Sequence, residues 1–167
     1  MYSQYGSRSF IPLDDFKGKA ANFFINCELK YSYQKCGAFE PGINFTTYLS
    51  QKKILSEGGL YLNYDIKFAK QKVIYGPKAG LGFMILFKKL RGIGFNAKAS
   101  LVSYNAFDNA DVRFMPEAGL TYFGVLNLNY SYSLPLNNTV ISEIGNHQIN
   151  IGINVGYWRT ILNLIMN

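Results

Sequence analysis

Charged residues are scarce in this chain of 167 residues, of which Asp, Glu, Lys and Arg make up only 16%. Soluble domains carry about 25% charged residues, so this supply is too small for an ordinary water-covered surface. The chain is nevertheless 49% hydrophobic, and its mean hydropathy is close to zero. This composition excludes a disordered chain, which would have few hydrophobic residues and a high net charge.

Histidine and cysteine are also scarce, with one His and two Cys. A zinc site commonly uses four ligands, mostly His and Cys, so we expect neither a metal site nor a cofactor. A Ser-His-Asp arrangement would depend entirely on His147. Cys27 falls within a predicted strand and Cys36 near the following turn, so we expect no disulfide between them.

Long hydrophobic runs are missing too. The longest lies within residues 79–87 and contains two glycines, whereas a membrane-spanning helix needs about 20 apolar residues. The amino-terminal sequence MYSQYGSRSFIPLDDFKGKA lacks the basic-then-apolar order of a secretion signal. We therefore expect no transmembrane helix, in a chain that is either cytosolic or has had its signal removed.

The strongest positive signal is an alternation with a period of two, as expected where successive side chains of a strand point to opposite faces. In residues 22–33 the apolar side chains lie at odd positions and the polar ones at even positions, with Phe24 as the exception. The 13 Tyr and 13 Phe are residue types that favour strands. We predict eight strands, at residues 22–33, 39–49, 60–68, 75–87, 93–101, 116–122, 126–133 and 148–155.

The predicted connections indicate an up-and-down meander. Tight links fall at residues 88–89 and 123–124, and longer Asn-rich loops fall at 105–112 and 137–145. Short and long connections would lie at opposite ends, except that residues 50–57 would form a long loop on the short side. The predicted organisation is a lead segment at residues 1–19, a barrel at 20–158 and a tail at 159–167.

The polar face of the predicted strands is rich in Asn, Ser, Thr and Gly, small residues that suit a narrow interior. Its charges balance, four acidic against four basic, and enclosed charges cost several kcal/mol each unless they are paired. They could form an ion path, but an eight-stranded barrel is only wide enough for side chains to fill, which favours a plug. The predicted lumen charges are Glu28, Lys30, Glu40, Asp65, Lys67, Lys78, Lys98 and Glu117.

The apolar face has no charge in the central parts of the strands, and Tyr and Phe recur near the strand ends, as in the aromatic girdles of membrane barrels. Runs of nine or more residues are long enough to cross a bilayer and longer than most strands of soluble sheets. Against a soluble barrel or a two-sheet sandwich, we therefore predict an all-β, eight-stranded antiparallel transmembrane β-barrel. The predicted girdle is Tyr31, Tyr33, Phe68, Tyr75, Phe87, Tyr122, Tyr130, Tyr132, Tyr157 and Trp158.

The stretches GPKAGLGF (76–83), MPEAGLTYFGVLNLNYSYSLPL (115–136) and HQINIGINV (147–155) resemble the small outer-membrane β-barrel proteins of Gram-negative bacteria. The resemblance covers residues 20–155 and implies a fold and an outer-membrane location, but no activity. In that family the last strand usually ends on an aromatic residue. Here Tyr157 and Trp158 precede a nine-residue tail.

The leading functional hypothesis is a non-enzymatic structural or accessory membrane protein with a sealed lumen, which binds through the loops at 105–112 and 137–145. One alternative is a lipid-modifying hydrolase centred on His147, near Ser142 and Glu143. The other is a soluble lipocalin-like carrier of small apolar ligands, with the apolar face inside.

The net charge of +7 is expected at the barrel ends and tails, because the eight lumen charges cancel. Lipids and lipopolysaccharide-type headgroups are the expected partners of these cations. Nucleic acid is not, because the aromatics share a face with aliphatic residues rather than with the basic ones. The basic residues are Lys52, Lys53, Lys88, Lys89 and Arg91 at one end and Lys35, Lys70 and Lys72 at the other.

Overall fold

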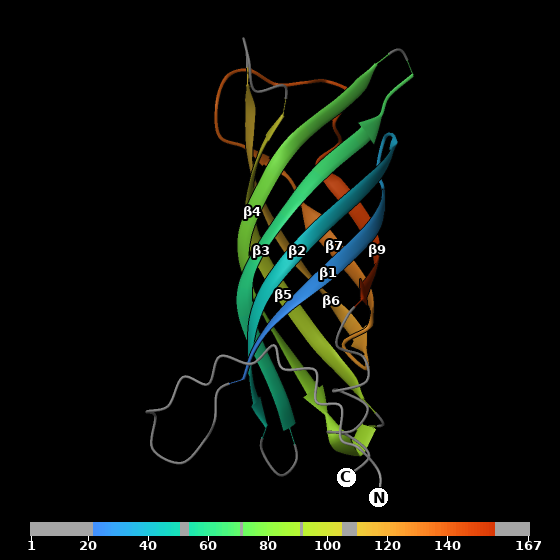
Figure 1. Cartoon of the computed structure of the whole chain (residues 1–167). Coiled ribbons are helices and arrows are strands. Elements are labelled where there is room, and N and C mark those ends of the chain that lie inside the picture. Colours follow the sequence, from blue (N-terminus) through green and yellow to red (C-terminus); the bar gives the residue numbers. More distant parts are fainter. Residues whose placement is uncertain (1–21, 51–53, 71, 91, 105–109, 156–167) are drawn as a thin grey trace, which may run out of the picture.

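The chain folds into a closed antiparallel β-barrel (Figure 1). The structure is a computed structural model that describes residues 22–50, 54–70, 72–90, 92–104 and 110–155. Among these residues, no helix is long and apolar enough to cross a membrane. The strands are β1 (Asn22–Tyr33), β2 (Gly37–Ser50), β3 (Ile54–Phe68), β4 (Val73–Phe87), β5 (Ile93–Tyr104), β6 (Asp111–Tyr122), β7 (Leu126–Tyr132), β8 (Leu134–Pro135) and β9 (His147–Val155), with a short 3-10 helix η1 (Lys88–Leu90).

The ring of the barrel contains eight strands, although nine are numbered. The two-residue strand β8 follows β7 and pairs with the same neighbour, β6, so β7 and β8 together occupy one position in the ring. Consecutive strands pair in order, and β9 pairs with β1 to close the ring. The ladder partners of Phe23, followed once around the ring, lead back to β1 at Tyr33, ten residues further along. This path runs through Thr47, Gly58, Phe83, Ala97, Ala118, Tyr130 and Ile149.

A stagger of this kind requires strongly tilted strands, at about 35–45° to the barrel axis. Because the offset of ten residues is even, every side chain keeps its inward or outward direction across the closure. The period-two pattern of the sequence is therefore satisfied around the whole ring.

The two faces of the strands have opposite compositions. At the described strand positions that point outward there is no Asp, Glu, Lys or Arg. Inward positions are buried and mostly polar, with 26 polar or charged residues buried against 11 hydrophobic ones among the described residues. This is the reverse of a soluble protein, in which charged residues are almost never fully buried.

The structure confirms the antiparallel eight-stranded meander, and it corrects two of the predicted loops. Residues 54–57 belong to β3, so the predicted loop at 50–57 is wrong, and this exception to the separation of short and long connections disappears. Likewise β6 begins at Asp111, inside the predicted loop at 105–112. The end with the turn at residues 34–36 is called the upper end and the end with η1 the lower end, as in Figure 1.

The lower β6–β7 connection is tight, as the sequence predicted, with three residues between the ladder partners Tyr122 and Leu126. Phe123 has φ of 54° and Gly124 has φ of 68°, and Val125 N donates to Tyr122 O at 3.1 Å. Two central residues with positive φ match the twist of antiparallel hairpins. Glycine provides this conformation without steric cost, and Phe123 adopts it as the one described non-glycine residue with positive φ.

Candidate functional site

Six charged side chains from five strands meet at mid-height inside the barrel and form what we call the central layer: Glu28, Lys30, Glu40, Lys78, Lys98 and Glu117. Lys30 Nζ lies 3.2 Å from Glu40, 3.3 Å from Glu117 and 3.8 Å from Glu28. Lys78 Nζ lies 2.9 Å from Glu40, and Lys98 Nζ lies 2.6 Å from Glu28. Three carboxylates thus balance three ammonium groups within one contact network.

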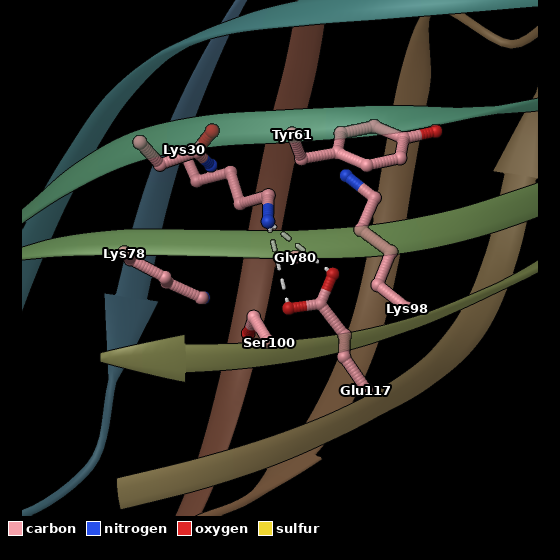
Figure 2. Close-up of a pocket in the computed structure, with 8 residues that line it drawn as sticks. Lys30, Tyr61, Lys78, Gly80, Lys98, Ser100 and Glu117 are labelled. Carbon is pink, nitrogen blue, oxygen red and sulfur yellow. Dashed lines mark hydrogen bonds and ion pairs between the residues drawn. The ribbon is translucent and has the colours of Figure 1, made fainter. Parts of the chain in front are cut away.

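Neutral side chains occupy further positions around the same carboxylates. Asn129 Nδ2 donates to Glu117 Oε1 at 2.7 Å, and Asn150 Nδ2 donates to Glu117 Oε2 at 3.0 Å. Asn63 Nδ2 donates to Glu40. Figure 2 shows Lys98 beside the ring of Tyr61, with its Nζ 4.1 Å from the ring centroid. Because buried charges need partners on several sides, these groups stabilise the layer.

A small cavity lies within the central layer, lined by Lys30, Tyr61, Lys78, Lys98 and Glu117 among others (Figure 2). It has room for about one water molecule. The side chains therefore fill the middle of the barrel, as expected for eight strands.

Two further buried pairs lie above the central layer, in what we call the upper compartment. Lys67 Nζ is 3.0 Å from Asp65, which also accepts a hydrogen bond from Tyr104 Oη at 2.6 Å. Arg113 holds Asp111 through two nitrogens, at 2.9 Å from Nε to Oδ1 and 2.7 Å from Nη2 to Oδ2. All five side chains are essentially inaccessible to solvent.

The eight predicted lumen charges thus all point inward, six in the central layer and two in the upper compartment. The prediction missed three buried charges, Glu57, Asp111 and Arg113. It assigned Glu57 and Asp111 to loops and left Arg113 outside the strand predicted at 116–122. With these three, the described lumen holds six acidic and five basic residues rather than four of each. The alternation from Asp111 to Met115 was a signal that could have found two of them.

Apolar side chains close the lower end of the lumen from within. Tyr48, Leu55, Met84 and Leu86 form a buried cluster, against which Phe24 packs. Phe24 and Tyr48 meet edge to face, with ring centroids 4.9 Å apart. All five residues belong to β1–β4, so this closure is part of the barrel wall.

The upper end is covered by residues 137–145, which we call the upper loop. Ile144 is 4% exposed and packs in a second apolar cluster with Ile74, Val102, Tyr104 and Met115. Other residues of the upper loop contact the two upper turns and the start of β6. These contacts are Lys35 Nζ to Ser142 O at 3.1 Å, Lys72 Nζ to Glu143 Oε1 at 3.0 Å, Arg113 Nη2 to Ile141 O at 3.2 Å and Ile141 N to Asp111 Oδ2 at 2.8 Å.

Eight of the ten predicted girdle aromatics are described, and all eight lie on the outer face. Tyr31, Tyr33, Phe68, Tyr75, Tyr130 and Tyr132 are in the upper half, whereas Phe87 and Tyr122 are near the lower end. Tyr157 and Trp158 lie outside the described residues, as do Lys52, Lys53, Arg91 and the segments 1–19 and 159–167. Exposed hydrophobic residues fill the belt between these aromatics, among them Ile43, Leu81, Leu128 and Ile151.

His147 lies on the outer face, with Tyr130 and Tyr132 as its contacts. Its Nδ1 shares a hydrogen bond with Tyr130 Oη, and the Tyr132 ring lies edge-on at 5.0 Å. Ser142 Oγ instead donates to Glu143 at 3.0 Å. A hydrogen bond between the Ser142 hydroxyl and the His147 imidazole, which a serine hydrolase would need, is not among the contacts of these described residues.

Comparison with known proteins adds no relative: no family model, curated protein or solved structure matches the chain.

Proposed function

We propose that this chain is an outer-membrane β-barrel protein with a non-enzymatic structural or accessory role, a sealed polar lumen and upper loops available for binding. The supporting observation is the outer face. It has no charged residue at the described strand positions, and most of its large side chains are 40–67% exposed. In water this belt would far exceed the apolar patches of a few hundred Å² that monomeric soluble proteins expose. A bilayer would cover it.

The interior supports the same proposal. A closed barrel is one of only two architectures that satisfy all backbone groups within a bilayer. In this barrel the buried charges of the central layer and the upper compartment are also paired with each other. A lipocalin-like carrier would instead need the apolar face inside, whereas here it lies outside. The exposed cations Lys35, Lys70, Lys72 and Lys89 lie in connections at the two ends, where they would meet anionic headgroups such as those of lipopolysaccharide.

Membrane fractionation combined with heat-modifiable gel migration tests the location. The chain, exported from a Gram-negative host behind a cleavable signal, is expected in the outer-membrane fraction after an alkaline wash. Unheated samples are expected to migrate differently from boiled ones. Recovery in the soluble fraction, with identical migration of heated and unheated samples, would contradict the proposal.

Planar-bilayer recording tests the sealed lumen separately. Because side chains fill the central layer and apolar clusters close both ends, the folded barrel is expected to add no stable conductance steps. Reproducible single-channel steps from the purified barrel would show that the lumen conducts.

A further inference from the structure

The two ends of the lumen are closed in different ways. The lower cluster comes entirely from strands, whereas the upper closure depends on the upper loop, which makes no ladder pairs. Its two ends are fixed, because Ser133 N donates to Asn146 O at 2.7 Å and Leu136 N donates to Val112 O at 2.8 Å. We propose that the upper loop is a lid, which opens and closes the upper compartment while these two anchor points stay in place.

The outer contacts of the lid are suited to repeated release. The Lys72 and Glu143 side chains are 49% and 41% exposed, and Lys35 is also exposed where it donates to Ser142 O. Water and salt screen contacts of this kind, so they hold the closed position only weakly. Elsewhere in the loop, Asn137, Asn138 and Val140 are exposed.

The inner contacts can also be released without isolating a buried charge. Ile141 binds through its backbone to Asp111 and Arg113, which hold each other through two nitrogens. If Ile141 leaves, the carboxylate and the guanidinium remain paired. Opening then moves two apolar side chains to water, the buried Ile144 and the partly buried Ile141 that packs against the same cluster. A segment fixed by so few buried contacts belongs to the least stable part of a fold.

Cys36 provides a native reporter of this motion. Its Sγ lies 4.0 Å from Glu143 O, beneath the loop, and the residue is only partly exposed. Burial raises the pKa of the Cys36 thiol, Lys67 lowers it, and Asp65 and Glu143 raise it. The second cysteine, Cys27, lies on the outer face of β1, so a Cys27→Ser background leaves one thiol to follow.

The experiment measures the rate at which a sulfonated maleimide labels Cys36 in detergent-solubilised barrel, with unheated gel migration as the check on folding. Glu143→Gln and Lys72→Gln each remove the outer ion pair and are both expected to raise the rate about two- to fivefold. Asn138→Ala, in the same loop, is the matched control and should leave the rate unchanged. High salt should accelerate the parent protein but neither charge variant.

The two charge variants separate lid opening from a direct effect on the thiol. Glu143→Gln removes a negative charge near Cys36, which by itself would lower the thiol pKa and speed labelling. Lys72→Gln removes a positive charge, which by itself would slow it. Opposite shifts from the two variants, or parent-like rates in both, would overturn the lid.

Ile144→Ala weakens the packing of the lid against the upper apolar cluster. It is expected to raise the labelling rate of Cys36 more than either charge variant, because it removes the buried side chain that opening exposes. An unchanged rate in a variant that keeps the folded gel band would also overturn the lid. Because labelling is measured on the folded barrel, these outcomes do not depend on the outer-membrane proposal, which stands or falls by fractionation.

Discussion

Adjacent residues of β7 lie in opposite surroundings. Leu126, Leu128 and Tyr130 point outward and are about half exposed, whereas Asn127 and Asn129 between them are at most 5% exposed. The proposed bilayer would cover the outer residues, whereas the inner ones require hydrogen-bond partners within the barrel. The stability of the barrel in the proposed bilayer therefore depends on both surroundings, and a single substitution on either face can disturb one of them.

The largest effect is expected inside, from Lys30→Met. Lys30 contacts three carboxylates, so its loss leaves buried negative charge uncompensated, at a cost of about 3–5 kcal/mol in the free energy of unfolding. Denaturant unfolding followed by gel migration measures this cost. Lys35→Met, at an exposed turn, is the control, and adding Glu117→Gln to Lys30→Met should recover part of the loss. Equal stability of the two single variants would show that the central layer is not a paired network.

On the outer face, Leu128→Arg tests whether a bilayer covers the apolar belt. Near the middle of the belt an arginine is expected to destabilise the barrel in lipid by about 2–4 kcal/mol, measured as unfolding from liposomes. Val140→Arg, at an exposed loop position outside the strands, should cost little. A neutral or stabilising Leu128→Arg would mean that water covers this surface.

A smaller effect is expected from Asn150→Ala, which removes a neutral member of the inner face. Asn150 donates to Glu117 at 3.0 Å and to Ser131 at 3.1 Å, and a buried acceptor left unpaired costs about 1–3 kcal/mol. The exposed Asn146→Ala is its control, and the denaturation midpoints of the two variants give the comparison. Matching midpoints would mean that the amides around Glu117 contribute nothing.

The smallest effect on stability is expected at Glu143, which lies in the upper loop and on neither face of the strands. Its hydrogen bonds from Lys72 and from the nearby backbone and Ser142 hold the pKa of this carboxyl below its ordinary value. A lowered pKa stabilises the folded state above the unfolded pKa and loses that contribution as the pH falls through the folded value. The stability difference between the parent and Glu143→Gln should therefore shrink from pH 7 towards pH 3. If the stability difference between the parent and Glu143→Gln stays constant from pH 7 to pH 3, the charge of Glu143 does not cause it.

Much of the fold was readable from the chain because alternation reports the facing of each strand residue directly. The bounds of β1 were predicted correctly, as were the starts of β5 and β7. The prediction failed at Gly58 and Gly59, which have no side chain to report a face and so hid the first half of β3. It also failed at Asp111, where an Asn- and Asp-rich stretch resembles a loop although the chain has already begun to alternate.

Part of the site was equally readable. The period-two alternation placed Glu28, Lys30 and Glu117 on the polar face. No local pattern could predict that Lys30 contacts Glu117, which is 87 residues away. Apolar residues at inward positions, such as Met84 and Leu86, broke the expected polar pattern, and their role in closing the lower end depends on neighbours from other strands.

The sequence by itself determined that the chain forms long antiparallel strands with one charge-free face and one polar face, because period-two alternation is a local property of the backbone. Only the tertiary structure decided which charges meet, because the ten-residue stagger of the closed ring sets the height of each strand against its neighbours. It likewise decided that the upper loop folds back over the lumen, since that position depends on contacts from the β1–β2 turn, the β3–β4 turn and β6 together.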